Sequence, residues 1–169
     1  MARLGCTCGG EMTNTQGPSQ HILNIFFVSE ANEAIAYNPQ IRLWDFYTGW
    51  DEIKDCEHSF QSRNQPVEYW YCTECGRIHE VQRISCGKII RSYSPQHLEK
   101  EPIVDLQNLK ELLVLTDIDM DKMLADYNEM LLSEYVNSPR NVKYYSSIDE
   151  KTVYIYENEH WKPLIYQME

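Results

Sequence analysis

The centre of the chain carries the sequence Tyr69-Trp70-Tyr71-Cys72-Thr73-Glu74-Cys75-Gly76-Arg77-Ile78, a cysteine pair between two apolar segments. A second pair, in Cys6-Thr7-Cys8-Gly9-Gly10, lies close to the first residue. Each pair brings two sulfur atoms within reach of one ion from a single turn, and four thiolates are the ligand set that tetrahedral Zn²⁺ prefers. The glycine after each pair permits a positive φ, so that backbone amides can point at the sulfurs. The sequence therefore predicts one Zn²⁺ per chain, with four ligands: Cys6, Cys8, Cys72 and Cys75.

This zinc site is expected to be structural rather than catalytic. A catalytic zinc keeps a position open for water, whereas four cysteines saturate the tetrahedral ion. His79 and Glu80 follow the second pair, and we expect both to be surface residues of a strand. The sequence contains no nucleophile-elbow, phosphate-loop or His-Glu-x-x-His motif. We therefore expect the protein not to be an enzyme.

Other interpretations of the cysteines remain open. Cys56-Glu57-His58 could supply two ligands in place of Cys6 and Cys8, although no glycine follows it. Cys86 is expected to be a buried strand residue. A redox-active Cys-x-x-Cys pair normally begins a helix in a βαβ unit. The residues after Cys75 instead predict a strand, which favours metal binding.

Composition and charge describe an acidic, folded protein. The 169 residues are 43% hydrophobic and carry a net charge of −11, which is enough apolar material for a core. A field of this sign repels nucleic acid and anionic lipid and attracts basic partners, although it is explained as well by the need to keep the protein soluble. The longest apolar runs are far shorter than the ~20 residues needed to span a bilayer. We expect a cytoplasmic protein with no membrane partner, in which reduced cysteines are free to bind metal.

The two cysteine pairs predict a split zinc-ribbon domain over residues 1–98, with an insertion over 9–71. Apolar and alternating segments predict its elements. These are strands over 21–28, 42–47, 69–71, 78–81 and 84–93, and a short helix over 31–36.

A proline-bracketed polar linker over 94–102 separates this domain from a second subdomain, which covers residues 99–169. Leu106, Leu109, Leu112 and Leu113 follow helical spacing and predict one helix. A second helix is expected to begin at Asp117 or Asp119 and to end before Pro139. Strands over 142–146, 152–156 and 161–167 then predict an antiparallel β-meander. The expected fold class is α+β: a zinc ribbon split by a β-rich insertion, followed by two helices and a C-terminal meander.

Two further sets of residues are candidates for a binding surface. Cations interleaved with His79 and Tyr93 form a stripe that could contact nucleic acid, although a solvated strand face explains it as well. The members of this stripe are Arg77, Arg83, Lys88 and Arg91. Tryptophans are enriched at interfaces, but core packing is their commoner place; the candidates are Trp44, Trp50, Trp70 and Trp161.

The two cysteine pairs, followed by Tyr93-Ser94-Pro95, resemble those of small, largely uncharacterised bacterial proteins in which a long insertion splits a zinc ribbon. The resemblance covers about residues 1–98, implies the same four cysteine ligands, and associates the chain with toxin–immunity or mobile-element proteins. We therefore expect a non-enzymatic, zinc-stabilised protein-interaction module. Its specific form would be an acidic inhibitor or immunity-type protein that covers a basic protein partner. The alternative is a nucleic-acid-binding zinc-ribbon protein of regulatory type.

Overall fold

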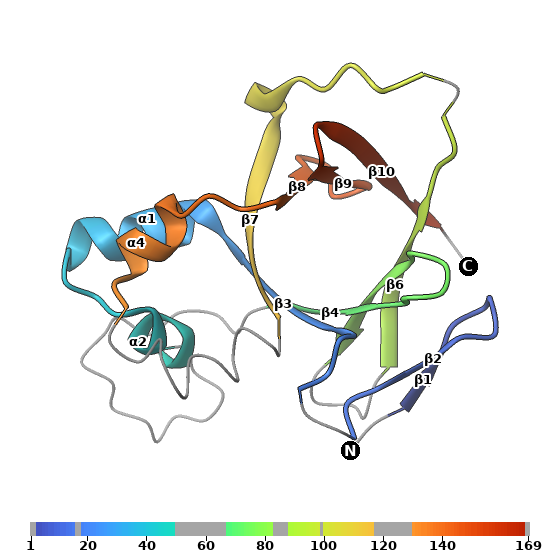
Figure 1. The fold of residues 1–169 in the computed structure, drawn as a ribbon, viewed down its shortest axis with the longest axis horizontal. Coiled ribbons are helices and arrows are strands. Elements are labelled where there is room, and N and C mark those ends of the chain that lie inside the picture. The colour runs from blue at the N-terminus through green and yellow to red at the C-terminus, as the bar shows by residue number, and fades with distance from the viewer. Residues whose placement is uncertain are drawn as a thin grey trace.

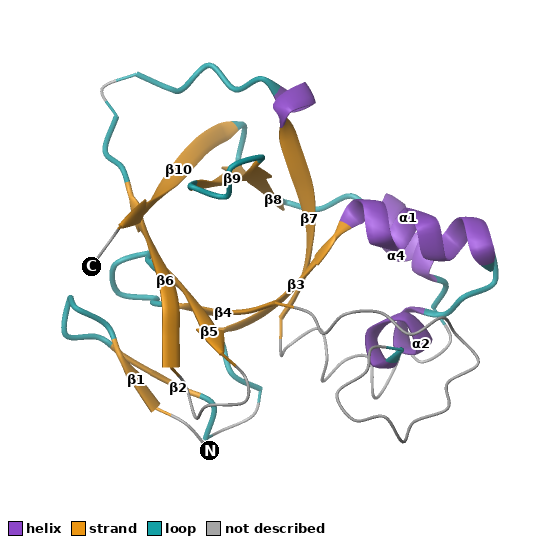
Figure 2. Cartoon of the chain, turned by 180° about the vertical axis from the view of Figure 1, so that it is seen from behind, coloured by secondary structure: helices purple, strands orange, loops and turns teal. Residues whose placement is uncertain are grey.

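A computed structural model describes residues 3–15, 18–49, 67–82, 88–98, 100–116 and 130–167 of the chain. Strands dominate this part of the protein (Figure 2). They are β1 (Arg3–Gly5), β2 (Glu11–Thr13), β3 (Ile22–Phe27), β4 (Val67–Tyr71), β5 (Ile78–Gln82), β6 (Lys88–Pro95), β7 (Leu109–Thr116), β8 (Val142–Ser147), β9 (Thr152–Glu157) and β10 (His160–Gln167). The helices are α1 (Val28–Tyr37), α2 (Leu43–Thr48) and α4 (Leu132–Asn137), with a 3₁₀ turn, η2 (Leu106–Asn108), before β7. None of the helices in these residues has the length and apolar character needed to cross a membrane.

Eight strands close into a barrel, in the order β10-β6-β5-β4-β3-β7-β8-β9 (Figure 1). Every neighbouring pair is antiparallel. Closure depends on two pairings between distant segments, β3 with β7 and β6 with β10. Because the ring is closed, each of these strands is paired with a neighbour on both sides and none is an edge strand.

The predicted α+β fold class is wrong. The strands expected to form the ribbon are three successive strands of the barrel wall, β4, β5 and β6, and β4 also pairs with β3. The strands of the expected C-terminal meander are continuous with the same wall through β6 and β7. Strands β3 to β6 from residues 1–98 and strands β7 to β10 from residues 99–169 therefore form the two halves of one closed sheet.

The barrel interior is filled by alternate residues of its strands. In β3, Leu23 and Ile25 belong to the interior cluster, whereas Ile22 and Phe26 pack on the outside. This alternation follows from the period of two along a strand. The interior cluster consists of Leu23, Ile25, Ile78, Tyr93, Leu112, Val153 and Leu164, with Tyr69, Tyr71, Tyr144 and Tyr166 among its half-buried members.

The three helices lie together beside β3 and β7 (Figure 1). Helix α1 begins directly after β3, and the Glu30 carboxylate accepts a hydrogen bond of 3.1 Å from the Phe27 amide, which satisfies one unpaired donor of the first turn. Their apolar side chains and the outward residues of the two strands form a second buried cluster. Its members are Phe26, Ala31, Ala34, Ile41, Leu43, Phe46, Leu113, Leu115 and Leu132.

Two sequence-based element predictions are wrong in this region. Residues 42–47, expected to be a strand, contain most of helix α2, in which Leu43 and Phe46 are buried one turn apart. Residues 106–113, expected to be a helix, contain η2 and the first half of strand β7. Leu112 faces the barrel interior and Leu113 faces the helices. Both faces of β7 are covered, so apolar residues occupy adjacent as well as alternate positions. The resulting spacing of leucines is the same as that expected on one face of a helix.

The other long helix, expected from Asp117 or Asp119, lies mostly outside the described residues, which contain only α4 at its end. Cys56, His58, Cys86, Arg83 and Trp50 also lie outside them.

Candidate functional site

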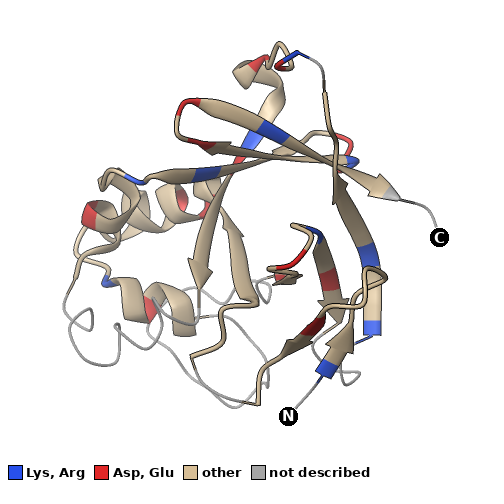
Figure 3. Ribbon diagram, turned by 45° about the vertical axis from the view of Figure 1, so that its right-hand side comes forward, with Lys and Arg blue, Asp and Glu red and all other residues tan. Residues whose placement is uncertain are grey.

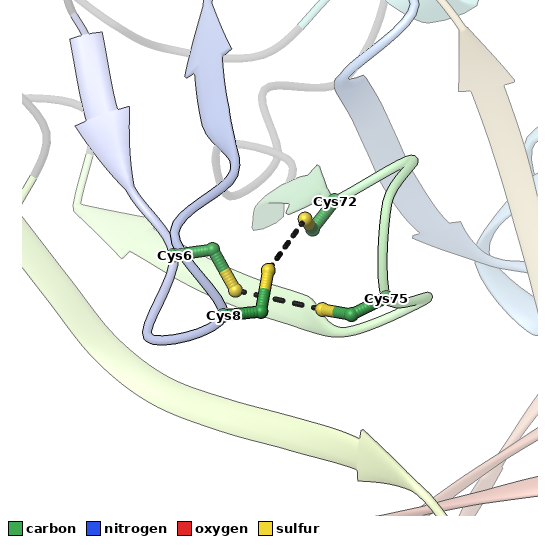
Figure 4. Close-up of side chains that lie close together, drawn as sticks. All are labelled: Cys6, Cys8, Cys72 and Cys75. Carbon is green, nitrogen blue, oxygen red and sulfur yellow. Dashed lines mark hydrogen bonds between the residues drawn. The ribbon is translucent and has the colours of Figure 1, made fainter.

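Two turns bring the four predicted cysteine ligands together. Cys6 and Cys8 come from the turn between β1 and β2, and Cys72 and Cys75 from the turn between β4 and β5. Their sulfur atoms point toward one another (Figure 4) and all lie within 4.8 Å of one another. We call these four residues the cysteine cluster. They could hold a metal ion.

The distances between the sulfur atoms fit one tetrahedral ion. The Sγ atoms of Cys6 and Cys75 are 3.6 Å apart, and those of Cys8 and Cys72 are 3.7 Å apart. Zinc–sulfur bonds of about 2.3 Å in a regular tetrahedron place the sulfurs about 3.8 Å apart. A disulfide would require about 2.05 Å. The cluster therefore has the dimensions of a metal site with four thiolate ligands.

Glycines shape both turns, as the sequence predicts. Gly9 and Gly76 have φ values of 95° and 72°, a conformation that strains residues with a Cβ. Gly10 has a different role, because a Cβ there would lie 3.0 Å from the Cys72 sulfur. Its amide also points at Cys8, with 3.4 Å between the Gly10 nitrogen and the Cys8 sulfur. The second glycine of the first turn thus lets the two turns approach each other.

The ionisation of the thiols shows how strongly the cluster concentrates negative charge. Burial alone would raise the pKa of Cys6, but hydrogen bonds from the Cys8 backbone, His79 and the neighbouring thiols lower it to about 5. Burial raises the pKa of Cys75 to about 12, and the sulfurs of Cys8, Cys6 and Cys72 contribute in the same direction. One thiolate thus forms readily and opposes ionisation of the others. A bound cation removes this conflict, because metal ligation stabilises thiolates.

Two side chains, Arg77 and His79, lie beside the cluster and can donate hydrogen bonds to its sulfur atoms. Neither was assigned a role at the metal site from the sequence. The Arg77 guanidinium lies 4.0 Å from the Cys6 sulfur, and it donates to Thr7 Oγ1 at 2.6 Å and to Ser94 Oγ at 2.7 Å. Arg77 thereby links the first cysteine turn to strand β6. Such outer contacts orient ligands and offset the charge of a four-thiolate site.

His79 is the second of these side chains. It is 2% exposed, so the expectation of a surface residue is wrong. Its Nδ1 lies 2.8 Å from Ser92 Oγ. Its buried Nε2 has no partner at ordinary hydrogen-bond geometry within the part of the chain that the structure describes. An Nε2–H directed toward a metal-bound thiolate would satisfy this atom, since the side chain already lowers the pKa of Cys6.

The β1–β2 hairpin packs against the outside of the barrel beside the cluster. Met12 is fully buried, and Leu4 lies next to it, against Ile22, Trp70 and Val81 of the barrel wall. The hairpin is a separate two-stranded sheet. A two-stranded hairpin is marginal in water by itself, so the apolar contacts and the cysteine cluster together hold it in place.

The basic stripe does not form one surface in the described residues. Arg77 is engaged at the cysteine cluster, and Arg91 lies in a cavity at one end of the barrel with Glu80 and Glu150. Lys88 is exposed at the start of β6. The contacts of Arg77 and Arg91 are thus with the protein itself.

The tryptophans separate into core and surface. Trp70 is 1% exposed and packs under the hairpin, and Trp44 is half-buried against the helices. Trp161 lies on the outward face of β10 with three tyrosines of β8 and β9. We call this group the aromatic surface; its members are Tyr145, Tyr154, Tyr156 and Trp161.

Fold and site together define a closed antiparallel β-barrel protein with a cluster of four cysteines, at the junction of two hairpins, that could hold a metal ion. The chain belongs to the family described as Domain of unknown function (DUF8617), whose model matches residues 2–100. This match includes all four cysteines of the cluster. Comparison with curated proteins and with solved structures found no match.

Proposed function

We propose that this protein is a non-catalytic protein-binding domain of the cytoplasm that depends on one structural zinc ion and binds a basic protein partner. The observation that carries the proposal is the aromatic surface on the outside of β8, β9 and β10. Its specific form is an acidic inhibitor or immunity-type protein that covers the basic surface of its partner.

The zinc part of the proposal rests on the cysteine cluster. Four thiolates complete the tetrahedral coordination of Zn²⁺, so the ion has no open position at which to activate water. Its contribution is to fold stability, because it joins the hairpin at the N-terminal end to the turn between β4 and β5. Four cysteine ligands could also bind a single iron ion. We propose zinc because it has no redox chemistry, and a structural site requires none.

Trp161 is the centre of the aromatic surface. Its ring centroid lies 4.7 Å from that of Tyr156, 5.4 Å from that of Tyr145 and 6.2 Å from that of Tyr154. All four side chains are half-buried, and none belongs to the three buried clusters of the described residues. The helices lie elsewhere, beside β3 and β7 (Figure 1). Tyrosine and tryptophan supply large contact area at low entropic cost and recur at the centres of interfaces.

A groove of about 340 Å³ adjoins the aromatic surface along one side of β10. Trp161, Pro163, Pro95 and Leu98 contribute apolar walls. Leu98 is 51% exposed, and Ile103 and Leu106, which lie farther along the chain and outside the lining of the groove, are exposed as well. Exposed apolar side chains next to half-buried aromatic rings are typical of a site that a partner covers.

Charge favours a basic partner. The chain has a net charge of −11, and acidic residues occur on helices, strands and turns (Figure 3). Four zinc-bound thiolates would add a further net charge of about −2. Lysine and arginine are also the side chains that stack on aromatic faces through cation–π contacts. The acidic field would accelerate the encounter and the aromatic rings would hold the basic side chains.

Tryptophan fluorescence and NMR titration with an arginine-rich peptide test this function. The wild-type protein should bind the peptide with shifts at the backbone amides of Tyr145, Tyr154 and Trp161, and should bind a citrulline-substituted peptide at least tenfold more weakly. Tyr154→Ala and Trp161→Ala should each weaken binding at least fivefold. Tyr37→Ala is the matched control, since Tyr37 is 71% exposed on α1.

Three results would contradict the proposal. The first is equal binding of the citrulline peptide, and the second is unchanged binding by both aromatic variants. The third is stronger retention on DNA or RNA than on the peptide, lost in a variant that combines Arg83→Ala with Arg91→Ala. That third result would establish the nucleic-acid-binding alternative.

A further inference from the structure

One end of the barrel interior holds a cavity of about 90 Å³ that combines apolar walls with three charged side chains. Its charged members come from three different segments: Glu80 of β5, Arg91 of β6 and Glu150 of the turn between β8 and β9. The other lining residues are Ile25, Phe27, Val67, Tyr69, Leu112 and Ser146. This cavity is separate from the cysteine cluster and from the aromatic surface.

Arg91 faces two carboxylates in this cavity. Its Nη1 lies 2.9 Å from Glu150 Oε2, and its Nε lies 3.5 Å from Glu80 Oε2. The Glu80 side chain is 16% exposed, compared with 37% for Arg91 and 46% for Glu150. Two carboxylates against one guanidinium leave one negative charge uncompensated among the lining residues. Burial raises the pKa of Glu80, Arg91 opposes this effect, and the negative charge of Glu150 adds to it.

The backbone is irregular at two of the three charged residues. The register between β5 and β6 shifts after Glu80, so that Glu80 is paired with Arg91 and Val81 with Ile89. Such a bulge re-aims neighbouring side chains. Glu150 has a positive φ of 57°, and its carbonyl accepts a hydrogen bond of 3.1 Å from the Tyr93 hydroxyl. A left-handed conformation is costly for glutamate, and its retention here places the carboxylate against Arg91.

The lining offers hydrogen-bond acceptors around an apolar chamber. The carboxylates of Glu80 and Glu150 and the lone pairs of the Ser146 hydroxyl, which donates to the Ser147 carbonyl at 3.1 Å, can accept three bonds. An ammonium group has three donors and no acceptor. Ile25 and Phe27 can contact a short alkyl stem. The Phe27 ring, which lines the cavity, already has one ammonium group near it, because Lys110 Nζ lies 5.3 Å from the ring centroid.

We propose that this end of the barrel is a binding site for a primary alkylammonium group, held by Glu80, Ser146 and Glu150 with its alkyl stem against the apolar wall. The ammonium neutralises the second carboxylate of the cavity. The volume suits one such group rather than a large cofactor. The group could belong to a free amine or to a lysine side chain of a protein. The site goes beyond the proposed function, because neither its residues nor its test depends on the aromatic surface.

NMR titration at pH 7 with n-butylammonium, n-butanol and butyrate tests the site on the wild-type protein. The ammonium should shift the backbone amides of Glu80, Arg91, Ser146 and Glu150 in a saturable manner, and n-butanol should bind at least tenfold more weakly. Glu80→Gln, which keeps the size of the side chain, should raise the Kd for n-butylammonium at least tenfold. Glu111→Gln should leave it within twofold. Glu111 is a matched control, because it also faces a cation, 4.0 Å from Lys143, but lies on β7 outside the cavity lining.

Every outcome of these titrations decides the proposal. Equal binding of n-butanol, stronger shifts with butyrate, or an unchanged Kd in Glu80→Gln would overturn it. A second pair of probes, N-acetyl-lysine methylamide and N-acetyl-norleucine methylamide, then identifies the source of the group. Preferential binding of the lysine compound supports a protein side chain as ligand. Binding of n-butylammonium without the lysine compound supports a free amine.

Discussion

Removal of the metal should destabilise the whole protein and not only the hairpin next to the cysteine cluster. The cluster joins Cys6 to Cys75, which are 69 positions apart. A cross-link that closes a loop of this length removes about 4 kcal/mol of conformational entropy from the unfolded chain. For a chain of this size, 1 kcal/mol corresponds to about 2–4 °C in the melting temperature, so the expected decrease is about 8–16 °C.

The assay combines elemental analysis with thermal unfolding before and after extraction by a strong chelator. We expect about one zinc per chain, and Cys72→Ser should lose both the zinc and the added stability. Cys56→Ser and Cys86→Ser are matched controls, and both should retain zinc and melt as the wild type does. An unchanged melting temperature in a chain shown to be metal-free would refute this reasoning. Loss of zinc in Cys56→Ser would favour the alternative ligand pair of Cys56 and His58.

Three further predictions concern single side chains. Arg77→Ala should lower the free energy of unfolding by about 1–2 kcal/mol and accelerate zinc loss to a chelator, because it removes the charged hydrogen bonds to Thr7 and Ser94. The control is Arg42→Ala, which breaks an exposed pair with Asp45 and should cost less than about 0.5 kcal/mol. Glu159→Gly should raise stability by about 1 kcal/mol in thermal unfolding, since Asn158 and Glu159 have φ values of 52° and 67° in the β9–β10 turn and Asn-Gly suits such a turn; a lower melting temperature would be contrary to this. Glu80→Gln should raise the melting temperature at pH 7.5 but not below pH 4. The pKa of Glu80 in the folded protein is above the ordinary value of about 4.3, so its ionisation destabilises the fold only as the pH rises. An equal gain at both pH values would show that ionisation is not the cause.

The local features of the fold could be predicted better than its closure. The apolar residues of β3 and the alternating residues of β9 predicted strands from neighbouring positions alone. The pairing of β3 with β7, and of β6 with β10, joins residues about as far apart as a whole small domain, and no local pattern specifies it. Once the ring closes, β7 is covered on both faces, so Leu112 and Leu113 are both buried. A strand with one buried face has apolar residues only at alternate positions, so two adjacent leucines were interpreted as part of a helix.

At the candidate site, too, the local features could be predicted from the sequence and the contacts between distant segments could not. Cysteine spacing and the following glycines were enough to predict which four residues the structure brings within 4.8 Å of one another. The roles of Arg77 and His79 depend on contacts with Thr7, Ser92 and Ser94 from other strands, which sequence spacing does not reveal. Their positions directly after the second cysteine pair were the available signal. The cavity at the barrel end was not predicted, because its charged residues come from three separate segments.

The closed ring has a consequence for the family to which the chain belongs. The family match ends at residue 100, after β6, whereas the partners of β3 and β6 that complete the ring are β7 and β10. A protein cut at the end of the match would leave β3 and β6 with unpaired backbone groups along one edge each, and such edges are templates for intermolecular sheet growth. Relatives that share only the matched region must therefore cap these edges in another way, either with unrelated C-terminal strands or with a second chain.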